Sequence, residues 1–586
     1  MSQPAARALR RGFLSVLLLL AAAVQADPPA VGSRGAVVAD APLLAPSVEP
    51  CVVRLYQDEV FDDFSLHDFN YAPPAACPGP FAKIVLRADF SVTTGRQFDR
   101  TANIWLGAVN LYFGTTQEPS ATVAPSWRIE RDISDYQSLL AMPQGGKIDL
   151  GNVVNETYTG ILHGSAEILF YPVAANEPAP PRRPDLILPL AAGPLGGSTD
   201  VVGTAEFSRS LALPRNIERI FLDVIAQSQA GDEFWMTCVP SEYATELQSC
   251  GNTAFRQTQI RIDGRPAGVA AVMPWLYTGA IDPGAWRPIP AVQTLAFEPW
   301  RVDLSPFAAQ LNDGEPHTVS IGVFNAGERF SVAANLLIYR DAGRAIVTGA
   351  LTDNTLDRDP PVQVTHTSSD EGGAVVTDLR VTSRRDYFIS GYVETSRGRF
   401  TTTVLQDLDF SNVQHFRISD SDYVQAIEQD TRVRTETRIE HNGRHHVLVD
   451  TRRLPLNLVY SYTELESGAE QKLDVRQQFD RTLDVGTAGF TARRASLSNA
   501  IHNGGELRFA SDGSLALRTA QFGEQTYDYR DDFGACYHRR LVAGAGAITS
   551  VTDGAGCPGG SNRRYAFDGF ANFSSSLLGA TLQLQP

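Results

Sequence analysis

The amino-acid sequence predicts an all-β protein made of two adjacent jelly-roll β-sandwich domains followed by a further all-β C-terminal region. Short runs rich in β-branched and aromatic residues recur along the chain, among them "AKIVLRADFSV", "NIWLGAVNLYFG" and "RIFLDVIAQS". Glycine, proline, asparagine or aspartate bounds these runs, and sustained helical periodicity is scarce. Short strands at regular spacing with frequent turns are typical of antiparallel sandwiches.

The first residues have the pattern of an export signal over residues 1–26. Arg7, Arg10 and Arg11 precede the apolar run "FLSVLLLLAAA", and "VQA" supplies a small-residue cleavage site. The apolar run is too short to span a bilayer, and no later segment reaches the ~18 apolar residues that a membrane helix needs. We therefore expect a secreted or periplasmic protein without a membrane span, in which residues 27–48, rich in Ala, Pro and Val, form a flexible leader.

The net charge argues against one class of partner. The formal charge is -16, and removal of residues 1–26, with three arginines and no acid, makes it -19. The phosphate backbone of a nucleic acid is repelled by such a surface, so we expect no nucleic-acid partner. The sequence carries no signal for the oligomeric state.

A proline-rich stretch marks the first domain boundary. The segment "EPAPPRRPD" disfavours a sheet interior and favours an extended linker, which we place at residues 174–185. The expected domains are an N-terminal jelly roll at 49–173, a second jelly roll at 186–340 and an all-β region at 346–586. The alternating pattern around "HNGRHH" in that last region predicts long hairpins. One short helix is predicted in "DISDYQSLL", Asp132–Leu140.

Six cysteines fall into three local pairs along the chain. The predicted disulfides are Cys51–Cys77, Cys238–Cys250 and Cys536–Cys557, each closing a short loop in a strand-rich segment. Six cysteines allow 15 pairings, so other connectivities stay open at this stage. The sequence has no CxxC pattern and no His/Cys cluster with the spacing of zinc ligands, and we expect neither a metal nor a cofactor.

One charged motif occurs twice, as "GRQFDR" over Gly95–Arg100 and as "RQQFDR" over Arg476–Arg481. Solvated charges at strand ends are the ordinary explanation of such a match. In the first copy, strand alternation directs Asp99 to the polar face at the start of "TANIWLGAVNLYFG". An acid in that position, beside Arg100, suits acid/base chemistry. The second copy, around Asp480, lacks this continuation and is assigned no role.

A longer series of motifs follows in order along the chain: "GRQFDRTANIWLGAVNLYF", "NETYTGILHGSAEILFYP", "GDEFWMTCVPSEY" and "PWLYTGAIDPGAWRPI". Over about residues 50–340 this series resembles the plant-type peptide-N-glycosidases, PNGase A and its bacterial acidic relatives. The resemblance implies hydrolysis of the amide that joins an asparagine side chain to the first N-acetylglucosamine of an N-glycan, which leaves aspartate in the peptide. It also implies two jelly rolls side by side with the site between them, and N-glycosylated peptides or proteins as the substrate.

The resemblance assigns roles to two acids. Asp99 inherits the role of primary catalytic carboxylate, because the distant flavobacterial relative PNGase F has its essential aspartate in a "WDR" context similar to "FDR" here. The second acid lies in "GDEFW", where Asp232 and Glu233 are predicted as strand neighbours on opposite faces. We choose Glu233, which would share a face with Trp235. A third acid of the flavobacterial enzyme is expected to be absent, with Asn152 in its place.

Further residues are candidates for contacts to the sugar or the amide. They are Arg100, Trp105, Asn152, Asp232, Trp235, Trp275, Trp286 and Arg287. Trp275 and Trp286, both in "PWLYTGAIDPGAW", are predicted to form an aromatic wall, with burial in the core as the alternative for either.

Amide hydrolysis needs an activated water, stabilisation of the oxyanion and protonation of the departing nitrogen. Two carboxylates and an arginine supply these functions without a metal, so we expect an acidic pH optimum and full activity in EDTA. Two other functions stay open from the residues alone. A glycoside hydrolase would use a similar acid pair between sugar rings. A non-catalytic carbohydrate-binding or adhesin protein would need only the sandwich and its aromatic residues.

Overall fold

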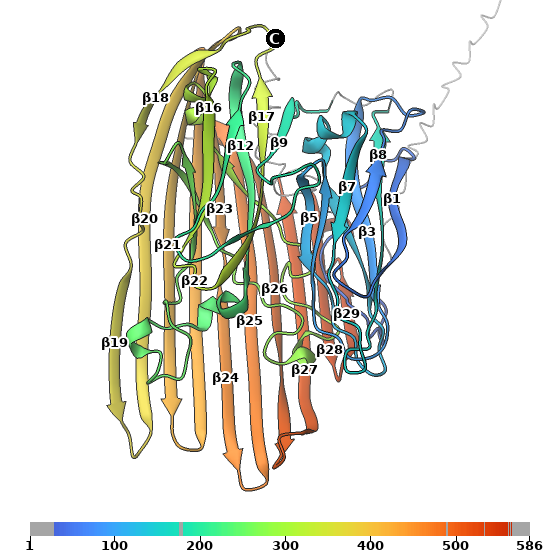
Figure 1. Cartoon of the computed structure of the whole chain (residues 1–586), viewed down its shortest axis with the longest axis vertical. Coiled ribbons are helices and arrows are strands. Elements are labelled where there is room, and N and C mark those ends of the chain that lie inside the picture. The colour runs from blue at the N-terminus through green and yellow to red at the C-terminus, as the bar shows by residue number, and fades with distance from the viewer. Residues whose placement is uncertain are drawn as a thin grey trace, which may run out of the picture.

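The computed structural model describes residues 29–174, 180–487, 490–532, 534–560, 562 and 564, and it confirms the all-β class (Figure 1). The helical elements of these residues are all 3-10 helices of three or four residues. Within the same part of the chain, no helix has the length and apolar character needed to cross a membrane. The export signal predicted at residues 1–26 lies outside the described residues.

The N-terminal unit consists of two four-stranded antiparallel sheets. The first contains, in spatial order, β1 (Cys51–Phe61), β8 (Leu162–Pro172), β3 (Phe81–Val92) and β6 (Ser126–Asp132). The second contains β2 (His67–Tyr71), β7 (Gln144–Asp149), β4 (Thr101–Leu106) and β5 (Val109–Thr115). Two 3-10 helices, η1 (Ser134–Tyr136) and η2 (Leu139–Ala141), take the place of the predicted short helix. One hydrophobic cluster joins the two sheets, with Leu86 and Phe90 from β3 and Ile104 from β4.

The second unit again has two antiparallel sheets. One contains β10 (Thr199–Val201), β17 (Arg329–Arg340), β12 (Ile217–Gln229) and β15 (Trp300–Asp303), with β9 (Leu186–Pro189) paired to β17. The other contains β11 (Phe207–Ala212), β16 (Pro316–Phe324), β13 (Gln257–Ile262) and β14 (Arg265–Ala271). The connections form η3 (Ala230–Asp232), η4 (Trp235–Thr237), η5 (Ser241–Tyr243), η6 (Pro283–Trp286), η7 (Ser305–Phe307) and η8 (Gln310–Asn312). The jelly-roll assignment of both units stays a prediction.

The two units pack against each other through strands that are buried on both faces. The backbone N–H of Asn110 in β5 donates to Asn335 Oδ1 of β17 at 3.2 Å, and Asn335 Nδ2 donates back to the Asn110 carbonyl at 2.9 Å. Phe221 of β12 belongs to the hydrophobic cluster of the N-terminal unit. All seven residues of β5 are buried for this reason, since β5 has a packed neighbour on each side.

The C-terminal region forms one antiparallel sheet of 12 strands. Its strands are β18 (Thr348–Asn354), β19 (Gln363–Asp370), β20 (Val375–Thr395), β21 (Gly398–Ile418), β22 (Asp422–His441), β23 (Arg444–Arg453), β24 (Leu456–Leu465), β25 (Gly468–Thr487), β26 (Phe490–Ala510), β27 (Leu515–Asp531), β28 (Cys536–Gly544) and β29 (Ala547–Asp553), followed by η9 (Pro558–Gly560). The long strands run past the end of the N-terminal unit (Figure 1). The predicted hairpin at "HNGRHH" is confirmed, because His441 pairs with Arg444 and the two residues between them have positive φ.

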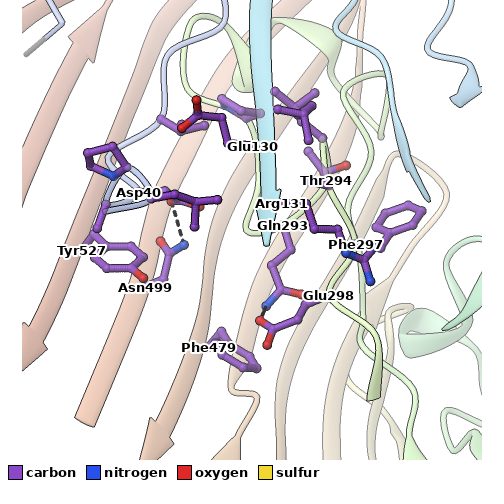
Figure 2. A pocket seen from close by; sticks show the side chains of 18 of the residues that line it. Asp40, Glu130, Arg131, Gln293, Thr294, Phe297, Glu298, Phe479, Asn499 and Tyr527 are labelled. Carbon is purple, nitrogen blue, oxygen red and sulfur yellow. Dashed lines mark hydrogen bonds between the residues drawn. The ribbon is translucent and has the colours of Figure 1, made fainter. Parts of the chain in front are cut away.

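Within the flexible leader predicted at residues 27–48, of which 29–48 are described, residues 37–41 are packed rather than free. Every second side chain from Val37 to Ala41 is buried. Between them, Asp40 accepts hydrogen bonds from Asn499 at 2.9 Å (Figure 2) and from Gln525 at 3.0 Å. Asp40 also lines a cavity of about 420 Å³ that the N-terminal unit and the C-terminal sheet share. The small apolar residues let this extended segment pack on the C-terminal sheet, which corrects the prediction.

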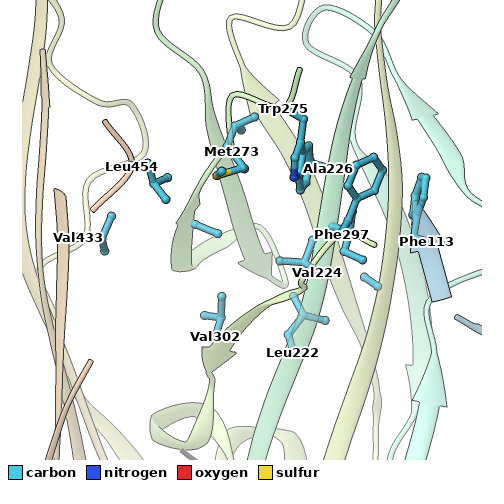
Figure 3. Close-up of a cluster of buried hydrophobic side chains, with 14 of the residues drawn as sticks. Phe113, Leu222, Val224, Ala226, Met273, Trp275, Phe297, Val302, Val433 and Leu454 are labelled. Carbon is cyan, nitrogen blue, oxygen red and sulfur yellow. The ribbon is translucent and has the colours of Figure 1, made fainter. Parts of the chain in front are cut away.

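One face of the C-terminal sheet packs on the second unit. Along β21, buried residues alternate with more exposed ones, as expected of a sheet with one covered face. Figure 3 shows Val433 and Leu454 of the C-terminal region across from Met273, Trp275 and Val302 of the second unit. All five side chains belong to one hydrophobic cluster, so the second unit and the sheet share a core.

All three predicted disulfides are confirmed. Cys51–Cys77 lies in the N-terminal unit, Cys238–Cys250 closes the loop after η4, and Cys536–Cys557 ties β28 to the segment after β29. None of the six cysteines, all of which lie in the described part of the chain, is free.

Candidate active site

Asp99 lies in the loop that leads into β4, ahead of the strand rather than inside it. Two hydrogen bonds fix this loop to the chain that leaves β5. The Arg100 N–H donates to Thr116 Oγ1 at 2.8 Å, and the Thr116 N–H donates to the Arg100 carbonyl at 2.9 Å. The side chain of Asp99 is partly buried there. The loop therefore holds Asp99 next to the residues that follow β5.

The chain leaving β5 carries a second acid, Glu118. In the β4–β5 hairpin Thr101 pairs with Thr115, so the residues just before β4 and just after β5 leave the paired region together. Glu118 is only 5% exposed. A Cβ built on Gly279 would lie under 3.0 Å from both Asp99 Oδ1 and Glu118 Oε1. The two carboxylates thus converge on the same glycine.

Glu118 is an acid that keeps its proton at neutral pH. Burial, assisted by the charge of Asp99, raises the pKa of Glu118 to about 8. The charge of Arg287 acts in the opposite direction, and its Nη2 donates to Glu118 Oε2 at 3.2 Å. Arg287 follows η6, at the start of which Asp282 accepts a hydrogen bond from the Gly284 N–H at 2.8 Å. The capped turn therefore presents Arg287 to Glu118.

Asp99 has a lower pKa than Glu118. Burial raises the pKa of Asp99 to about 6, and the charge of Arg100 and the backbone N–H of Gly279 limit this rise. Arg100 Nη2 donates to Gln97 Oε1 at 3.0 Å, while its buried Nε has no hydrogen-bond partner among the described residues. The guanidinium of Arg100 thus supplies a positive charge next to Asp99.

The third acid of the site is Glu233, in the turn after β12. Burial and the charge of Asp99 raise the pKa of Glu233 to about 7. Tyr277 lies near both acids: its hydroxyl donates to the Ser228 carbonyl at 2.6 Å, and burial together with the charges of Glu233 and Asp99 raises its pKa. Asp99 therefore stands at the centre of the site, because its charge acts on both other carboxyl groups.

Strand alternation predicts Asp232 and Glu233 as neighbours on one strand, but the structure has no strand at these residues. Residues 230–232 form η3, and Ala230 has a φ of 53°. The turn directs Asp232 into the protein, where it is 1% exposed and pairs with Arg256 at 3.0 Å. The Gly327 N–H also donates to its carboxylate at 2.9 Å. The predicted substrate contact of Asp232 is therefore wrong, and the choice of Glu233 as the catalytic acid stays a prediction.

Glu233→Gln is expected to lower kcat by about 100-fold or more at an unchanged melting temperature, because glutamine keeps the shape and loses the titrating group. Asp232→Asn is expected to lower the melting temperature instead. It leaves Arg256 buried without a charged partner, at a cost of about 3–5 kcal/mol. Activity per folded molecule and thermal melts at pH 6 separate the two roles. A greater loss of kcat in Asp232→Asn than in Glu233→Gln would reverse the assignment.

The four predicted tryptophan contacts are wrong, because all four side chains belong to the core. Trp105, Trp235, Trp275 and Trp286 are between 0% and 4% exposed. Trp105 lies on β4, which is covered on both faces, and the indole N–H of Trp286 donates to the Ala280 carbonyl at 2.8 Å. Trp275 lies among the apolar side chains of Figure 3. Core burial, the alternative to the aromatic wall, therefore holds for Trp275 and Trp286.

Asn152 has a structural role rather than contacting a substrate, because its side chain is buried and bonds to the backbone. Its side chain is 0% exposed, and its Nδ2 donates to the Phe61 carbonyl at 2.9 Å. The expectation that Asn152 takes the place of the flavobacterial third acid stays a prediction, but the structure places another acid, Glu118, beside Asp99.

An aromatic pair made of the exposed Phe98 and the half-buried Tyr158 lies beside Asp99. Phe98 is 44% exposed, and its ring centroid is 5.1 Å from that of Tyr158. The guanidinium of Arg96 lies 5.3 Å from the centroid of the Tyr158 ring. The exposed ring of Phe98 has an apolar face of the kind that packs on a sugar, which the buried tryptophans do not present.

The structure brings four of the predicted residues together: Asp99, Arg100, Glu233 and Arg287. It adds three that the sequence argument did not single out: Glu118, Tyr277 and Gly279. The register of the β4–β5 hairpin is the signal that predicts Glu118, because counting outward from the turn places it beside the Asp99 loop. The loop that carries Tyr277 and Gly279 has no comparable local pattern.

The chain is similar to proteins of known activity. The sequence model of the family described as peptide N-acetyl-beta-D-glucosaminyl asparaginase amidase A matches residues 63–355. Over 392 residues, 63% of this chain and 67% of the relative, it is 31% identical to peptide-N4-(N-acetyl-beta-glucosaminyl)asparagine amidase A of Prunus dulcis. One similar solved structure is PNGase F, a glycosylasparaginase from Flavobacterium meningosepticum, with 13% identity and a TM-score of 0.32 over 50% of this chain and 96% of that chain. Another is PNGF-II, with 12% identity and a TM-score of 0.33 over 50% and 65% of the two chains.

Proposed function

The chain belongs to the peptide N-acetyl-beta-D-glucosaminyl asparaginase amidase A family, and on that premise we propose that Asp99, Glu118 and Glu233 carry out its reaction. The reaction is hydrolysis of the amide between an asparagine side chain and the first N-acetylglucosamine of an N-glycan. Water adds to the side-chain carbonyl carbon, the C–N bond breaks, and the products are an aspartate in the peptide and a glycosylamine. The observation that carries the proposal is the convergence of Asp99 and Glu118 on Gly279.

The three pKa values divide the carboxyl groups into one base and two acids. Between the pKa of Asp99, about 6, and that of Glu233, about 7, Asp99 is ionised while Glu233 and Glu118 keep their protons. Asp99 takes a proton from the attacking water, and Glu233 gives its proton to the departing nitrogen. Glu118 stays protonated, and its neutral carboxyl group acts as a hydrogen-bond donor in the site. Arg100 and Arg287, whose charges act on Asp99 and Glu118, stabilise the oxyanion.

The sugar next to the scissile amide binds at the aromatic pair of Phe98 and Tyr158. Phe98 precedes Asp99 directly, so a sugar ring that lies on Phe98 and Tyr158 brings its linkage to the carboxylates. The apolar face of a pyranose packs on such rings, and Arg96 beside them donates to sugar hydroxyls. Glycopeptide binding therefore depends on residues of the loop that also carries the base.

Mass spectrometry of a defined glycopeptide tests the proposed reaction. Incubation in heavy-oxygen water is expected to yield a peptide with aspartate in place of the glycosylated asparagine, carrying the heavy oxygen in its new carboxyl group. A product with one N-acetylglucosamine still on asparagine would indicate a glycoside hydrolase. An unchanged glycopeptide that elutes with the protein would indicate a binding protein. Either outcome would overturn the amidase mechanism.

The value of kcat/KM is expected to follow a bell-shaped pH profile that peaks on the acid side of neutral. It rises as Asp99 ionises through its pKa of about 6 and falls as Glu233 ionises through its pKa of about 7. Steady-state rates on one glycopeptide across this range check the expectation. The Glu233→Gln variant is the control, since its residual activity should lack the alkaline limb. A maximum well above pH 7 would contradict the role of Glu233.

The disulfides support export as part of the same proposal. Three disulfides in one chain fit an oxidising compartment, which is either the periplasm or the exterior of the cell. Removal of residues 1–26 as a signal peptide is consistent with this location.

A further inference from the structure

The turn that follows Glu233 rests on the C-terminal sheet through side-chain amides. Asn412 Nδ2 donates to the Met236 carbonyl at 3.0 Å, and Gln414 Nε2 donates to the Cys238 carbonyl at 2.9 Å. The carbonyl between them, that of Thr237, accepts from Gln425 Nε2 at 2.8 Å. Three successive carbonyls of the turn are thus held by β21 and β22. We call Asn412, Gln414 and Gln425 the first amide cluster.

The loop that carries Tyr277, Gly279 and Arg287 rests on the same sheet in the same way. Gln477 of β25 connects both ends of this loop, because its Nε2 donates to the Pro274 carbonyl at 2.7 Å and its Oε1 accepts from the Val292 N–H at 3.0 Å. We call Gln477 and the two amides described next, Asn503 and Gln521, the second amide cluster.

The middle of that loop is held by the next two strands. Asn503 of β26 donates through its Nδ2 to two carbonyls, that of Ala285 at 2.9 Å and that of Ile289 at 2.8 Å. Gln521 of β27 donates to the Arg287 carbonyl at 3.1 Å. The backbone on either side of Arg287 is therefore fixed by the second amide cluster.

These amides add to the backbone pairing of the sheet, and those of the first cluster also bond to one another: Gln414 Nε2 donates to Asn412 Oδ1 at 2.9 Å, and Gln425 Nε2 donates to Gln414 Oε1 at 2.8 Å. The strands pair through their backbones, and Asn412, Gln414, Gln425, Gln477 and Asn503 are all 5% exposed or less. A buried amide that loses its partner costs about 1–3 kcal/mol, so each one constrains the loop it contacts. Gln406 of β21 gives the contrast, because it accepts from Tyr387 and donates to Thr435, and neither partner lies on the two loops.

We infer that the C-terminal sheet is a working part of the active site, in which the two amide clusters are positioning residues for the two loops around Asp99. The inference rests on the proposed function. The family match ends at residue 355, before all five strands that carry these amides. The first amide cluster sets the distance from Glu233 to Asp99. The second sets the Gly279 N–H against Asp99 and Arg287 against Glu118.

Each cluster should control a different limb of the pH profile. If the second cluster is weakened, Asp99 loses the Gly279 N–H that lowers its pKa, so the acid limb moves to higher pH. If the first cluster is weakened, Glu233 loses part of the burial, and part of the nearby Asp99 charge, that raise its pKa, so the alkaline limb moves to lower pH. A role confined to stability would move neither limb.

Three full-length variants test this: Gln477→Met, Gln414→Met and the matched control Gln406→Met. We expect kcat to fall by about 10- to 100-fold in the first two, with the two opposite limb shifts, because small displacements of reacting groups are costly. The control should keep kcat within about twofold and both limbs in place. The inference would be overturned if the pH profiles of Gln477→Met and Gln414→Met kept both limbs at the wild-type positions. It would also be overturned if either limb shifted equally in Gln406→Met.

Hydrogen exchange gives a readout that does not depend on activity. Backbone amides of residues 274–292 should exchange faster in Gln477→Met than in Gln406→Met or the wild type. Should Gln477→Met fail to fold, Asn503→Leu tests the same loop with the same expected outcome. If residues 274–292 exchange more slowly in the wild type than in Gln477→Met, but the wild type cleaves no glycopeptide, the proposed function fails while the loop attachment stands. Unchanged exchange over 274–292 would refute the attachment itself.

Discussion

Asp99→Asn is expected to abolish glycan release, lowering kcat/KM by about 100- to 10,000-fold, the range that a positioned general base contributes. Asparagine matches the shape of aspartate and can still accept the Gly279 N–H, but it cannot take a proton from water. Removing the charge of Asp99 also lowers the pKa values of Glu118 and Glu233, which that charge raises. Steady-state rates at pH 6, with thermal melts of the same samples, measure the effect.

Asp480→Asn is the matched control, because Asp480 occupies the same place in the second copy of the motif. Its side chain lies on the strand face opposite to that of the buried Phe479 and Arg481, and it accepts a hydrogen bond from Gln478 at 2.7 Å. Activity within about twofold of wild type is expected, as for a surface substitution remote from the site. Equal loss in both variants would mean that the loop before β4 is not the catalytic one.

Gly279→Ala is expected to lower kcat by about 100-fold, through a different physical effect. The added methyl group would lie under 3.0 Å from Asp99 Oδ1 and Glu118 Oε1, so the carboxylates or the loop must move. The Gly279 backbone does not need a positive φ, and the effect is therefore steric. Displacement of reacting groups by about 1 Å is known to cost rates of this size. Single-turnover rates on a glycopeptide measure the loss.

Gly322→Ala is the control for the steric argument. A Cβ there would meet Glu206 Cγ at 3.5 Å, which is ordinary van der Waals contact, in a buried strand of the same unit. Wild-type kcat and a similar melting temperature are expected. If Gly279→Ala also kept its activity, the two carboxylates would not have to converge for catalysis.

Local pattern was sufficient to predict the strands, and it failed where pairing is not local. The hairpin at Asn442 and Gly443 could be predicted because two residues with positive φ set the register of both strands. The assembly of 12 strands into one sheet could not be predicted in this way. It depends on pairs such as β22 with β24 and β23 with β25, which are not consecutive in sequence. Residues 37–41 were misjudged because composition does not reveal a distant surface on which a segment packs.

Within the site, the four residues that were predicted and found together came from motifs that the resemblance covers, chiefly those around Asp99 and Glu233. The tryptophans failed because aromatic residues serve the core more often than a binding face, and Trp105 sits on a strand covered on both sides. Strand alternation separates Asp232 from Glu233 in the sequence argument, but the local backbone is a 3-10 turn. Glu118 required the register of a hairpin rather than a motif.

The burial of Glu118 links folding of the whole chain to the proton concentration. The pKa of Glu118 is about 8 in the folded protein, against an ordinary value of 4.5 in the unfolded chain. Between these two pH values the folded chain holds a proton that the unfolded chain releases. Because the folded pKa is the higher one, the stabilisation is complete below the unfolded pKa and is lost as pH rises through about 8. Folding near neutral pH therefore takes up protons from the solution, and alkali favours the unfolded chain even where no covalent damage occurs.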